Sequence, residues 1–184
     1  ELEFIEGKAG KPSVRSSVRI VATEQTLYIG ARFEEPNMSE VTRTVRVHDE
    51  NAWADDCLEL FFLPGLDAAG DYYQWVVSAS DAVFDAKREG TGTNKDLWNG
   101  KGIGFKTFRG TDHWSVEVAV PFASIPGATN QPVMRFNATR NRPKLENSTR
   151  PEEYMSWSVL RSSSSHTPAR YGVLAFAARG GKLP

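Results

Sequence analysis

The feature that most constrains the fold is an alternation of apolar and polar residues that recurs along almost the whole chain. Successive side chains of a β-strand point to opposite faces of a sheet, so this alternation is typical of half-buried strands. Helical periodicity is nearly absent. The strand pattern covers residues 16–22, 27–33, 41–47, 57–63, 72–79, 81–86, 102–108, 113–120, 133–139, 154–160 and 171–176.

Turn residues separate these short segments. Pro64-Gly65 ends one of them, and residues 109–112 (RGTD) give a hairpin-like turn between two others. One helical turn is expected at 121–125, and long polar loops are expected at 87–101 and 140–153. Many short strands with frequent turns predict an all-β fold, namely an antiparallel, jelly-roll-like β-sandwich with very little helix.

Composition limits the kinds of partner. The 184 residues are 40% hydrophobic, which suits one domain with a proper core. Lys and Arg number 22 against 23 Asp and Glu, and no apolar run approaches the roughly 20 residues of a membrane span. We therefore expect neither nucleic acid nor membrane as a partner. The single cysteine, Cys57, excludes an internal disulfide framework and is expected to be a small buried residue.

The same alternation predicts a polar face on the central strands. In residues 57–62 it sends the leucines and Phe62 to one face and Glu59 to the other. The residues expected on the polar face are Glu59, Gln74, Ser78, Asn137 and Thr139. If they share one face, they form a platform of hydrogen-bonding groups of the kind that meets sugar hydroxyls. The alternative is a solvated outer face without a ligand.

Two tryptophans differ in their setting. Trp53 lies outside the core pattern, on a polar turn at residues 48–56 (HDENAWADD). Its ring offers an apolar surface on which a pyranose can rest. Trp157 is instead expected in the core, because it shares an apolar face with Met155 and Val159.

Motifs of common enzyme classes are missing. The histidines His48, His113 and His166 are scattered, and neither a metalloprotease motif, a serine nucleophile elbow nor a phosphate-binding glycine loop occurs. Asp55, Asp56 and Glu59 are the carboxylates closest to a glycosidase pattern, yet such clusters more often serve turns or hard cations. We expect no enzyme. Carboxylates expected to hold a structural calcium are Asp49, Asp55, Asp56 and Asp67.

An ordered series of motifs resembles carbohydrate-binding module family 9 and family-9-like domains. The series comprises LYIGARFEEP (27–36), WADDCLELFFLPG (53–65), DYYQWVVSASDAVFDA (71–86), HWSVEVAVPFASI (113–125), MRFNATRNR (134–142), SWSVL (156–160) and TPARYGVLAF (167–176). The resemblance implies a β-sandwich that binds glycan ends, with structural calcium in some members. It also implies a position at the end of a secreted polysaccharide-degrading enzyme, hence a secreted, cell-surface or periplasmic location.

The resemblance also implies site residues. Sugar-binding members clamp the ring between two tryptophans, and a glutamate, an arginine and amides bind its hydroxyls. Trp53 and Glu59 match the first tryptophan and the glutamate, and Ser165 or His166 stands where the second tryptophan is expected. Val76 and Ser78 replace the arginine and asparagine of one strand. The sugar-binding residues expected are Trp53, Glu59, Asn137, Thr139, Arg150 and His166.

Three interpretations remain open. The first is a non-catalytic sugar-binding domain spanning residues 1–184, which lacks the first strand that family members carry before a segment like FIEGK. The second is a structural domain that packs against a catalytic neighbour without binding a ligand, which the incomplete tryptophan clamp favours. The third is haem binding through Met, His or Lys, as in related sandwiches. Met134 falls in the core pattern, and Met38 and Met155 show no partnered spacing, which speaks against it.

Overall fold

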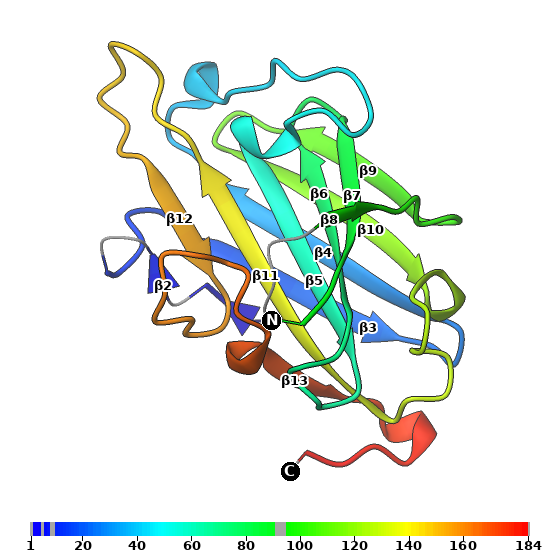
Figure 1. Cartoon of the computed structure of the whole chain (residues 1–184). Helices are drawn as coiled ribbons and strands as arrows, with labels where there is room; N and C mark the ends of the chain where they lie inside the picture. The colour runs from blue at the N-terminus through cyan, green and yellow to red at the C-terminus, as the bar shows by residue number, and fades with distance from the viewer. Residues whose placement is uncertain (1, 5, 8–9, 91–94, 184) are drawn as a thin grey trace.

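The computed structural model describes residues 2–4, 6–7, 10–90 and 95–183 and shows two antiparallel sheets that face each other (Figure 1). The first sheet has five strands in the order β1-β3-β4-β10-β9. Their bounds are Leu2–Glu3 (β1), Ser16–Ala22 (β3), Thr26–Glu34 (β4), His113–Pro121 (β10) and Gly104–Arg109 (β9).

The second sheet has eight strands in the order β2-β12-β11-β5-β6-β7-β8, with β13 paired to β11. Their bounds are Glu6–Gly7 (β2), Glu153–Ser156 (β12), Val133–Arg142 (β11), Cys57–Pro64 (β5), Tyr72–Ser78 (β6), Val83–Arg88 (β7), Lys95–Leu97 (β8) and Gly172–Ala175 (β13). The predicted all-β antiparallel sandwich is confirmed.

Helical structure in the described residues consists of short 3₁₀ turns. They are Met38–Glu40 (η1), Ala52–Ala54 (η2), Phe122–Ser124 (η3), Pro168–Arg170 (η4) and Ala177–Arg179 (η5). The turn η3 lies within the predicted helical segment 121–125. Across this part of the chain, no helix has the length and apolar character that crossing a membrane requires.

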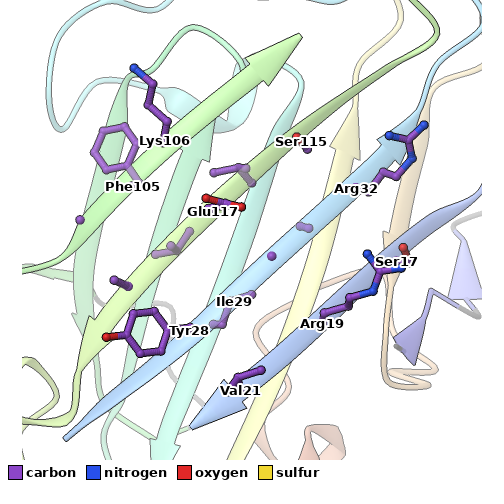
Figure 2. Close-up of a pocket in the computed structure, with 16 residues that line it drawn as sticks. Ser17, Arg19, Val21, Tyr28, Ile29, Arg32, Phe105, Lys106, Ser115 and Glu117 are labelled. Atoms are coloured by element: carbon purple, nitrogen blue, oxygen red, sulfur yellow. The ribbon is translucent and has the colours of Figure 1, made fainter. Parts of the chain in front are cut away.

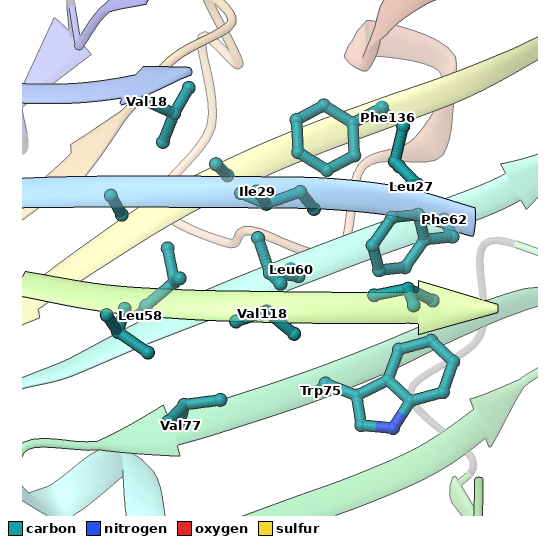
Figure 3. Close-up of a cluster of buried hydrophobic side chains, with 14 of the residues drawn as sticks. Val18, Leu27, Ile29, Leu58, Leu60, Phe62, Trp75, Val77, Val118 and Phe136 are labelled. Atoms are coloured by element: carbon teal, nitrogen blue, oxygen red, sulfur yellow. The ribbon is translucent and has the colours of Figure 1, made fainter. Parts of the chain in front are cut away.

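The core lies between the two sheets (Figure 3). From the first sheet, Leu27 and Ile29 on β4 point inward, and from the second, Leu60 and Phe62 on β5 meet them. Burial of each such side chain contributes about 1.5–3 kcal/mol, so the alternation in the sequence is what brings the sheets together. The outward residues of the second sheet are therefore those with odd numbers on β5 and β11, and even numbers on β6.

The predicted strand at 41–47 is wrong, because the backbone of this segment bonds to aspartate side chains. The segment forms no strand in the structure. Its backbone N–H groups bond to carboxylates instead: Thr42 N to Asp56 at 2.8 Å, and Thr44 N to Asp55 at 2.7 Å. Aspartates at the entry to β5 thus satisfy donors that a neighbouring strand would otherwise satisfy.

Two other segments differ from the prediction. Strand β12 ends at Ser156, and Val159 is exposed rather than buried with Met155. Trp157 is partly buried and packs against the core beside Phe136, at 5.7 Å between ring centroids. The predicted loop 87–101 contains the end of β7 and the strand β8, while residues 91–94 lie outside the described residues.

Charge rather than apolar packing fills one end of the space between the sheets. Arg140 and Arg142 follow the apolar residues on the inner face of β11. Arg142 Nε and Nη2 donate hydrogen bonds to the two carboxylate oxygens of Glu35, at 2.7 and 2.9 Å. The complete buried ion network consists of Glu35, Asp56, Glu153, Arg140, Arg142 and Arg150.

Candidate functional site

A row of polar side chains crosses the outer face of the second sheet. It runs from Arg88 on β7 through Gln74 on β6 to Glu59 on β5. The Gln74 amide joins its neighbours: Nε2 donates to Glu59 at 2.7 Å, and Oε1 accepts from Arg88 Nη2, also at 2.7 Å. Because a single amide serves both charged groups, the three side chains hold one fixed arrangement.

The row forms the floor of a hollow of about 310 Å³. Its walls come from Trp53 on η2, Tyr154 on β12, and Ser165 and His166 in the loop before η4. The residues that line it are Trp53, Glu59, Gln74, Arg88, Asn141, Tyr154, Ser165 and His166. Two aromatic side chains and both ends of a charged row therefore meet at one small opening.

Trp53 is placed by the 3₁₀ turn η2, which precedes β5. Its ring stands edge-on to Phe84, at 4.9 Å between centroids and 88° between planes. Asn141 Nδ2 donates a hydrogen bond to the Trp53 carbonyl. The ring packs on a small outer cluster around Val76 and Phe84 and remains partly exposed, so one part of the indole is anchored while another borders the hollow.

His166 enters the hollow from the serine-rich loop before η4. Its Nδ1 lies 2.9 Å from the Tyr72 hydroxyl, and its ring stands edge-on to Phe61 at 5.6 Å. Burial, together with the positive charge of Arg88, lowers the pKa of His166 to about 4. The imidazole is therefore neutral at physiological pH and acts as a hydrogen-bonding group rather than a cation.

Glu59 has the opposite character. Burial raises its pKa to about 7, although the hydrogen bond from Gln74 and the charge of Arg88 pull the pKa down. Burial also lowers the pKa of Arg88, which nevertheless stays protonated near neutrality. The floor of the hollow thus offers an acceptor whose charge changes in the physiological range, next to a permanent donor.

A second hollow of about 730 Å³ adjoins the first and shares Tyr154 and Ser165 with it. Thr139 and the serine-rich segment at residues 162–165 line it. Two buried polar atoms at these hollows have no hydrogen-bond partner within the described chain: Asn141 Oδ1 beside the first and Thr139 Oγ1 beside the second. Seven other buried side-chain atoms of the described residues also lack a partner, so these two atoms show bonding capacity at the hollows and do not by themselves mark a ligand site.

The structure brings together only some of the residues that the sequence predicted. Trp53, Glu59 and His166 line the first hollow, and Thr139 lines the second. Asn137 shares their face but bonds to Ser156 Oγ at 2.9 Å and Ser158 N at 3.1 Å, so it fastens β11 to the following segment.

Arg150 lies elsewhere. Its guanidinium belongs to the buried ion network, where Nη2 bonds to Asp56 at 2.9 Å. The arginine of the hollow is Arg88 instead, which sequence reasoning assigned to a loop. Asn141 and Tyr154 were also missed. For Arg88 and Asn141 a signal existed, because extension of the alternation in β7 and β11 places both on the same face as Gln74 and Asn137.

Of the four predicted calcium ligands, three have other partners or settings. Asp55 accepts a bond from Thr44 N in the segment 41–47, Asp56 pairs with Arg150, and exposed Asp67 accepts from Ala69 N. Asp49 lies with His48 and Asp85, and their possible ligand atoms fall within 4.8 Å, the one such group among the described residues. One imidazole with two carboxylates is not the oxygen-rich set that calcium prefers. Nothing in the structure tests a structural calcium, which stays a prediction. An unchanged melting temperature after chelation would contradict it.

The fold and the hollow together define a β-sandwich of the binding-module type. The chain belongs to the carbohydrate family 9 binding domain-like family, whose model matches residues 3–178. The resemblance seen in the ordered motifs is thereby confirmed. Among curated proteins, no sequence matches this chain.

Solved structures share the fold at low sequence identity. A candidate carbohydrate-binding protein from Bacteroides uniformis ATCC 8492 gives a TM-score of 0.76 at 18% identity, covering 95% of this chain and 84% of that one. A carbohydrate binding module family 9 from Caldicellulosiruptor kristjanssonii in complex with glucose gives 0.68 at 15%, covering 96% and 83%. Its complex with cellotriose gives 0.68 at 14%, covering 95% and 80%.

Proposed function

We propose that the domain is a non-catalytic carbohydrate-binding module whose sugar lies in the hollow between Trp53 and Tyr154. The observation that carries the proposal is the convergence of Trp53 with the Arg88–Gln74–Glu59 row on one opening. A sugar ring has an apolar C–H face and a rim of hydroxyls. The hollow offers an aromatic surface for the face, and donors and acceptors in fixed positions for the rim.

The polar row suits neutral hydroxyls. Glu59 accepts from a hydroxyl, Arg88 donates to one, and Asn141 Oδ1 gains the partner that it lacks. Hydrogen bonds to charged groups contribute about 1.5–3 kcal/mol each, and the cost of removing water from Arg88, Gln74 and Glu59 reduces their sum. A few such bonds and one stacked ring give the modest affinity that suits a module holding a long polymer.

The family's second tryptophan has no counterpart in this site, and Tyr154 is the structural candidate to take its place. Tyr154 lines both hollows and is 45% exposed, so its ring is available to a ligand that extends from one hollow into the other. The neighbouring structures hold glucose and cellotriose. These relatives support a glucan end as the ligand to test first.

The hollow does not supply the machinery of a glycosidase. Glycosidases of the usual kinds flank the scissile bond with two carboxyl groups about 5–9.5 Å apart. Among the described residues that line the two hollows, Glu59 is the only carboxylic acid. This composition supports binding rather than hydrolysis.

We further propose, from the family to which the chain belongs, that the domain is attached to an exported polysaccharide-degrading enzyme. The competing candidate is a structural accessory domain that packs on its catalytic neighbour and binds no sugar. The missing second tryptophan favours that alternative, whereas the unfilled hydrogen-bonding capacity of Asn141 and Thr139 favours a ligand.

The test is calorimetric titration of the isolated domain with glucose, cellotriose and a panel of neutral oligosaccharides. We expect binding of at least one of them, and a loss of about tenfold or more in affinity for Trp53→Ala, because the stacking surface is removed. Circular dichroism of the variant serves as the control for folding. Failure of the whole panel to bind the folded wild-type domain would favour the structural alternative.

A further inference from the structure

One histidine and two aspartates meet beside β7, outside the sugar hollow. They are His48 and Asp49, in the loop before η2, and Asp85 on β7. Their possible ligand atoms all lie within 4.8 Å of one another. None of the three lines the hollow that holds Trp53 and Glu59. The cluster is therefore separate from the proposed sugar site.

The backbone of the loop is fastened to β7. Asp49 N donates to the Val83 carbonyl at 2.9 Å, and Asp85 N donates to Asp49 Oδ1 at 3.4 Å. Asp49 has a left-handed backbone conformation, with a φ of 64°, which aspartate adopts more readily than most residues. These bonds hold the Asp49 side chain against the beginning of β7, next to Asp85.

The carboxylate of Asp85 is only partly used by the fold. The side chain is 3% exposed, and Oδ2 accepts a hydrogen bond from Gly100 N. Oδ1 is the one carboxylate oxygen among the described buried atoms that lack a hydrogen-bond partner. It faces His48, whose Nε2 lies 3.6 Å away, too far for a hydrogen bond. A buried anionic oxygen beside two further metal-ligating side chains points to a bound cation.

His48 supplies both a nitrogen ligand and a route from solvent. Its side chain is 51% exposed, whereas that of Asp49 is 27% exposed. Each ring nitrogen lies near one carboxylate: Nδ1 is 3.0 Å from Asp49 Oδ2, and Nε2 is 3.6 Å from Asp85 Oδ1. One nitrogen of an imidazole can therefore bind an ion while the other donates its N–H to a carboxylate, which is the usual support of a metal-bound histidine.

The ligand set favours zinc over calcium or magnesium. Calcium takes six to eight oxygen ligands and magnesium an octahedron of oxygens, whereas zinc combines histidine nitrogen with carboxylate oxygen in four-coordinate sites. Tetrahedral bonds of about 2.0–2.2 Å place neighbouring ligand atoms about 3.3–3.6 Å apart. The 3.6 Å between His48 Nε2 and Asp85 Oδ1 agrees with this spacing.

The hollow on the outer face of the first sheet offers no comparable set (Figure 2). It measures about 810 Å³, yet its lining contains neither histidine nor aspartate. Glu117 is its one carboxylate, and Lys106 lies directly opposite on β9. Within the described part of the chain, the cluster beside β7 is the arrangement that suits a cation.

We propose that His48, Asp49 and Asp85 bind a zinc ion that fastens the loop to β7. The inference goes beyond the proposed function and does not depend on it. The loop continues into η2, whose Trp53 packs on Phe84, the residue before Asp85 on β7. The ion would therefore join the two segments that position this indole.

The experiment is calorimetric titration of the chelator-treated domain with zinc chloride at neutral pH, with calcium chloride as the comparison. We expect one zinc ion to bind per domain and calcium to bind at least about tenfold more weakly. Zinc at about a hundred times its dissociation constant should raise the melting temperature by about 5–10 °C, because the ion binds only the folded state.

Three single variants test the ligands. His48→Ala changes an exposed side chain, and Asp49→Asn keeps a residue that adopts the left-handed conformation. Asp85→Asn keeps an oxygen that can accept from Gly100 N. We therefore expect all three to fold, which circular dichroism checks. Each should weaken zinc binding by about tenfold or more, because a ligand of the ion is lost or loses its charge.

His113→Ala is the matched control. His113 Nδ1 also lies beside an aspartate, 2.7 Å from Asp112 Oδ1, but no third ligand joins this pair among the described residues. This variant should bind zinc as the wild type does.

Three outcomes would overturn the inference. The first is no zinc binding by the folded wild-type domain, which would leave the cluster as an ion pair. The second is zinc binding that the three ligand variants leave unchanged, or that His113→Ala weakens as much as they do. The third is calcium binding as tight as that of zinc, which would show that the ion is wrongly assigned.

Discussion

Two groups of buried polar side chains lie on opposite faces of the strand β11, and they are built differently. On the inner face, the buried ion network sets three carboxylates against three guanidinium groups at hydrogen-bonding distance. On the outer face, the hollow holds Glu59 and Arg88 with the Gln74 amide between them, and Asn141 Oδ1 has no partner. The charged groups of the network bond mainly to one another, although Arg140 Nε and Arg150 Nε have no partner, whereas the hollow offers Asn141 Oδ1 to a ligand at an opening.

The carboxylate pKa values show this difference between Glu35 and Glu59, although burial also raises the pKa of Asp56 within the network despite the charge of Arg150. Burial pushes the pKa of Glu35 up, but the hydrogen bond and charge of Arg142, with help from Arg140, bring it below its ordinary value. Burial prevails at Glu59, whose pKa rises to about 7. Removing one partner from the network would leave a buried charge uncompensated, whereas Glu59 already bears part of that desolvation cost in the folded chain.

The largest effect is expected from breaking the network. Arg150→Ala leaves Asp56 and Glu35 without one of their cations in a buried setting, which typically costs about 3–5 kcal/mol. Urea denaturation should show this loss in the free energy of unfolding, while the folded variant keeps its sugar affinity. A loss below about 1 kcal/mol would contradict the structural role assigned to Arg150.

A pair of tryptophan variants should separate packing from binding. Trp157→Ala removes a partly buried ring beside Phe136, so we expect about 3 kcal/mol of lost stability and little change in sugar affinity. Trp53→Ala should show the reverse balance, although loss of its contact with Phe84 will cost some stability. Melting temperature and affinity measured for both variants check this. Collapse of Trp53→Ala, with sugar binding intact in its folded fraction, would show that the site is misplaced.

The pH dependence of stability offers a third contrast. The pKa of Glu59 is about 7 in the folded chain, against an ordinary value of 4.5. Between pH 4.5 and pH 7 the folded state therefore keeps a proton that the unfolded state has released. Stability from this group is complete below pH 4.5 and is lost as the pH rises through 7, by about 3 kcal/mol. Glu59→Gln lacks the group, so the difference between the two unfolding curves isolates it. A difference that does not change between pH 4.5 and 7 would contradict the raised pKa.

The smallest effect concerns the second aromatic wall. Tyr154 is 45% exposed, so Tyr154→Ala should lower the free energy of unfolding by only about 1 kcal/mol. Its loss should still weaken binding about threefold to tenfold, because a stacked ring contributes about 0.5–1.5 kcal/mol. Titration with cellotriose measures this. Unchanged affinity would leave Trp53 as the only stacking surface.

The sequence predicted the sandwich well because alternation depends on local geometry alone. Glu59, Gln74 and Asn137 were assigned to one face correctly, since a strand allows only two choices. Alternation does not reveal how many partners a polar residue finds. Arg150 and Asn137 were therefore read as free groups, although one sits in the ion network and the other fastens two segments.

Other errors came from chemistry between distant segments. Residues 41–47 have a strand-like sequence, but Asp55 and Asp56 satisfy their N–H groups. Arg88 was missed because Gly90 and the polar residues after it suggested a loop, while the ladder with Tyr72 extends β7 through Arg88. Such outcomes depend on tertiary pairing, which a single sequence does not display.

The most direct test of the central claim is a ¹H–¹⁵N correlation spectrum of the domain during titration with cellotriose. The chain has five tryptophans, and Trp53 alone lines the proposed sugar site. We predict that the indole N–H resonance of Trp53 shifts with saturating dependence on sugar, while those of Trp75 and Trp114 in the core stay in place. A Trp53 resonance that does not move while cellotriose binds, or binding that moves resonances elsewhere, would contradict the assignment of this site.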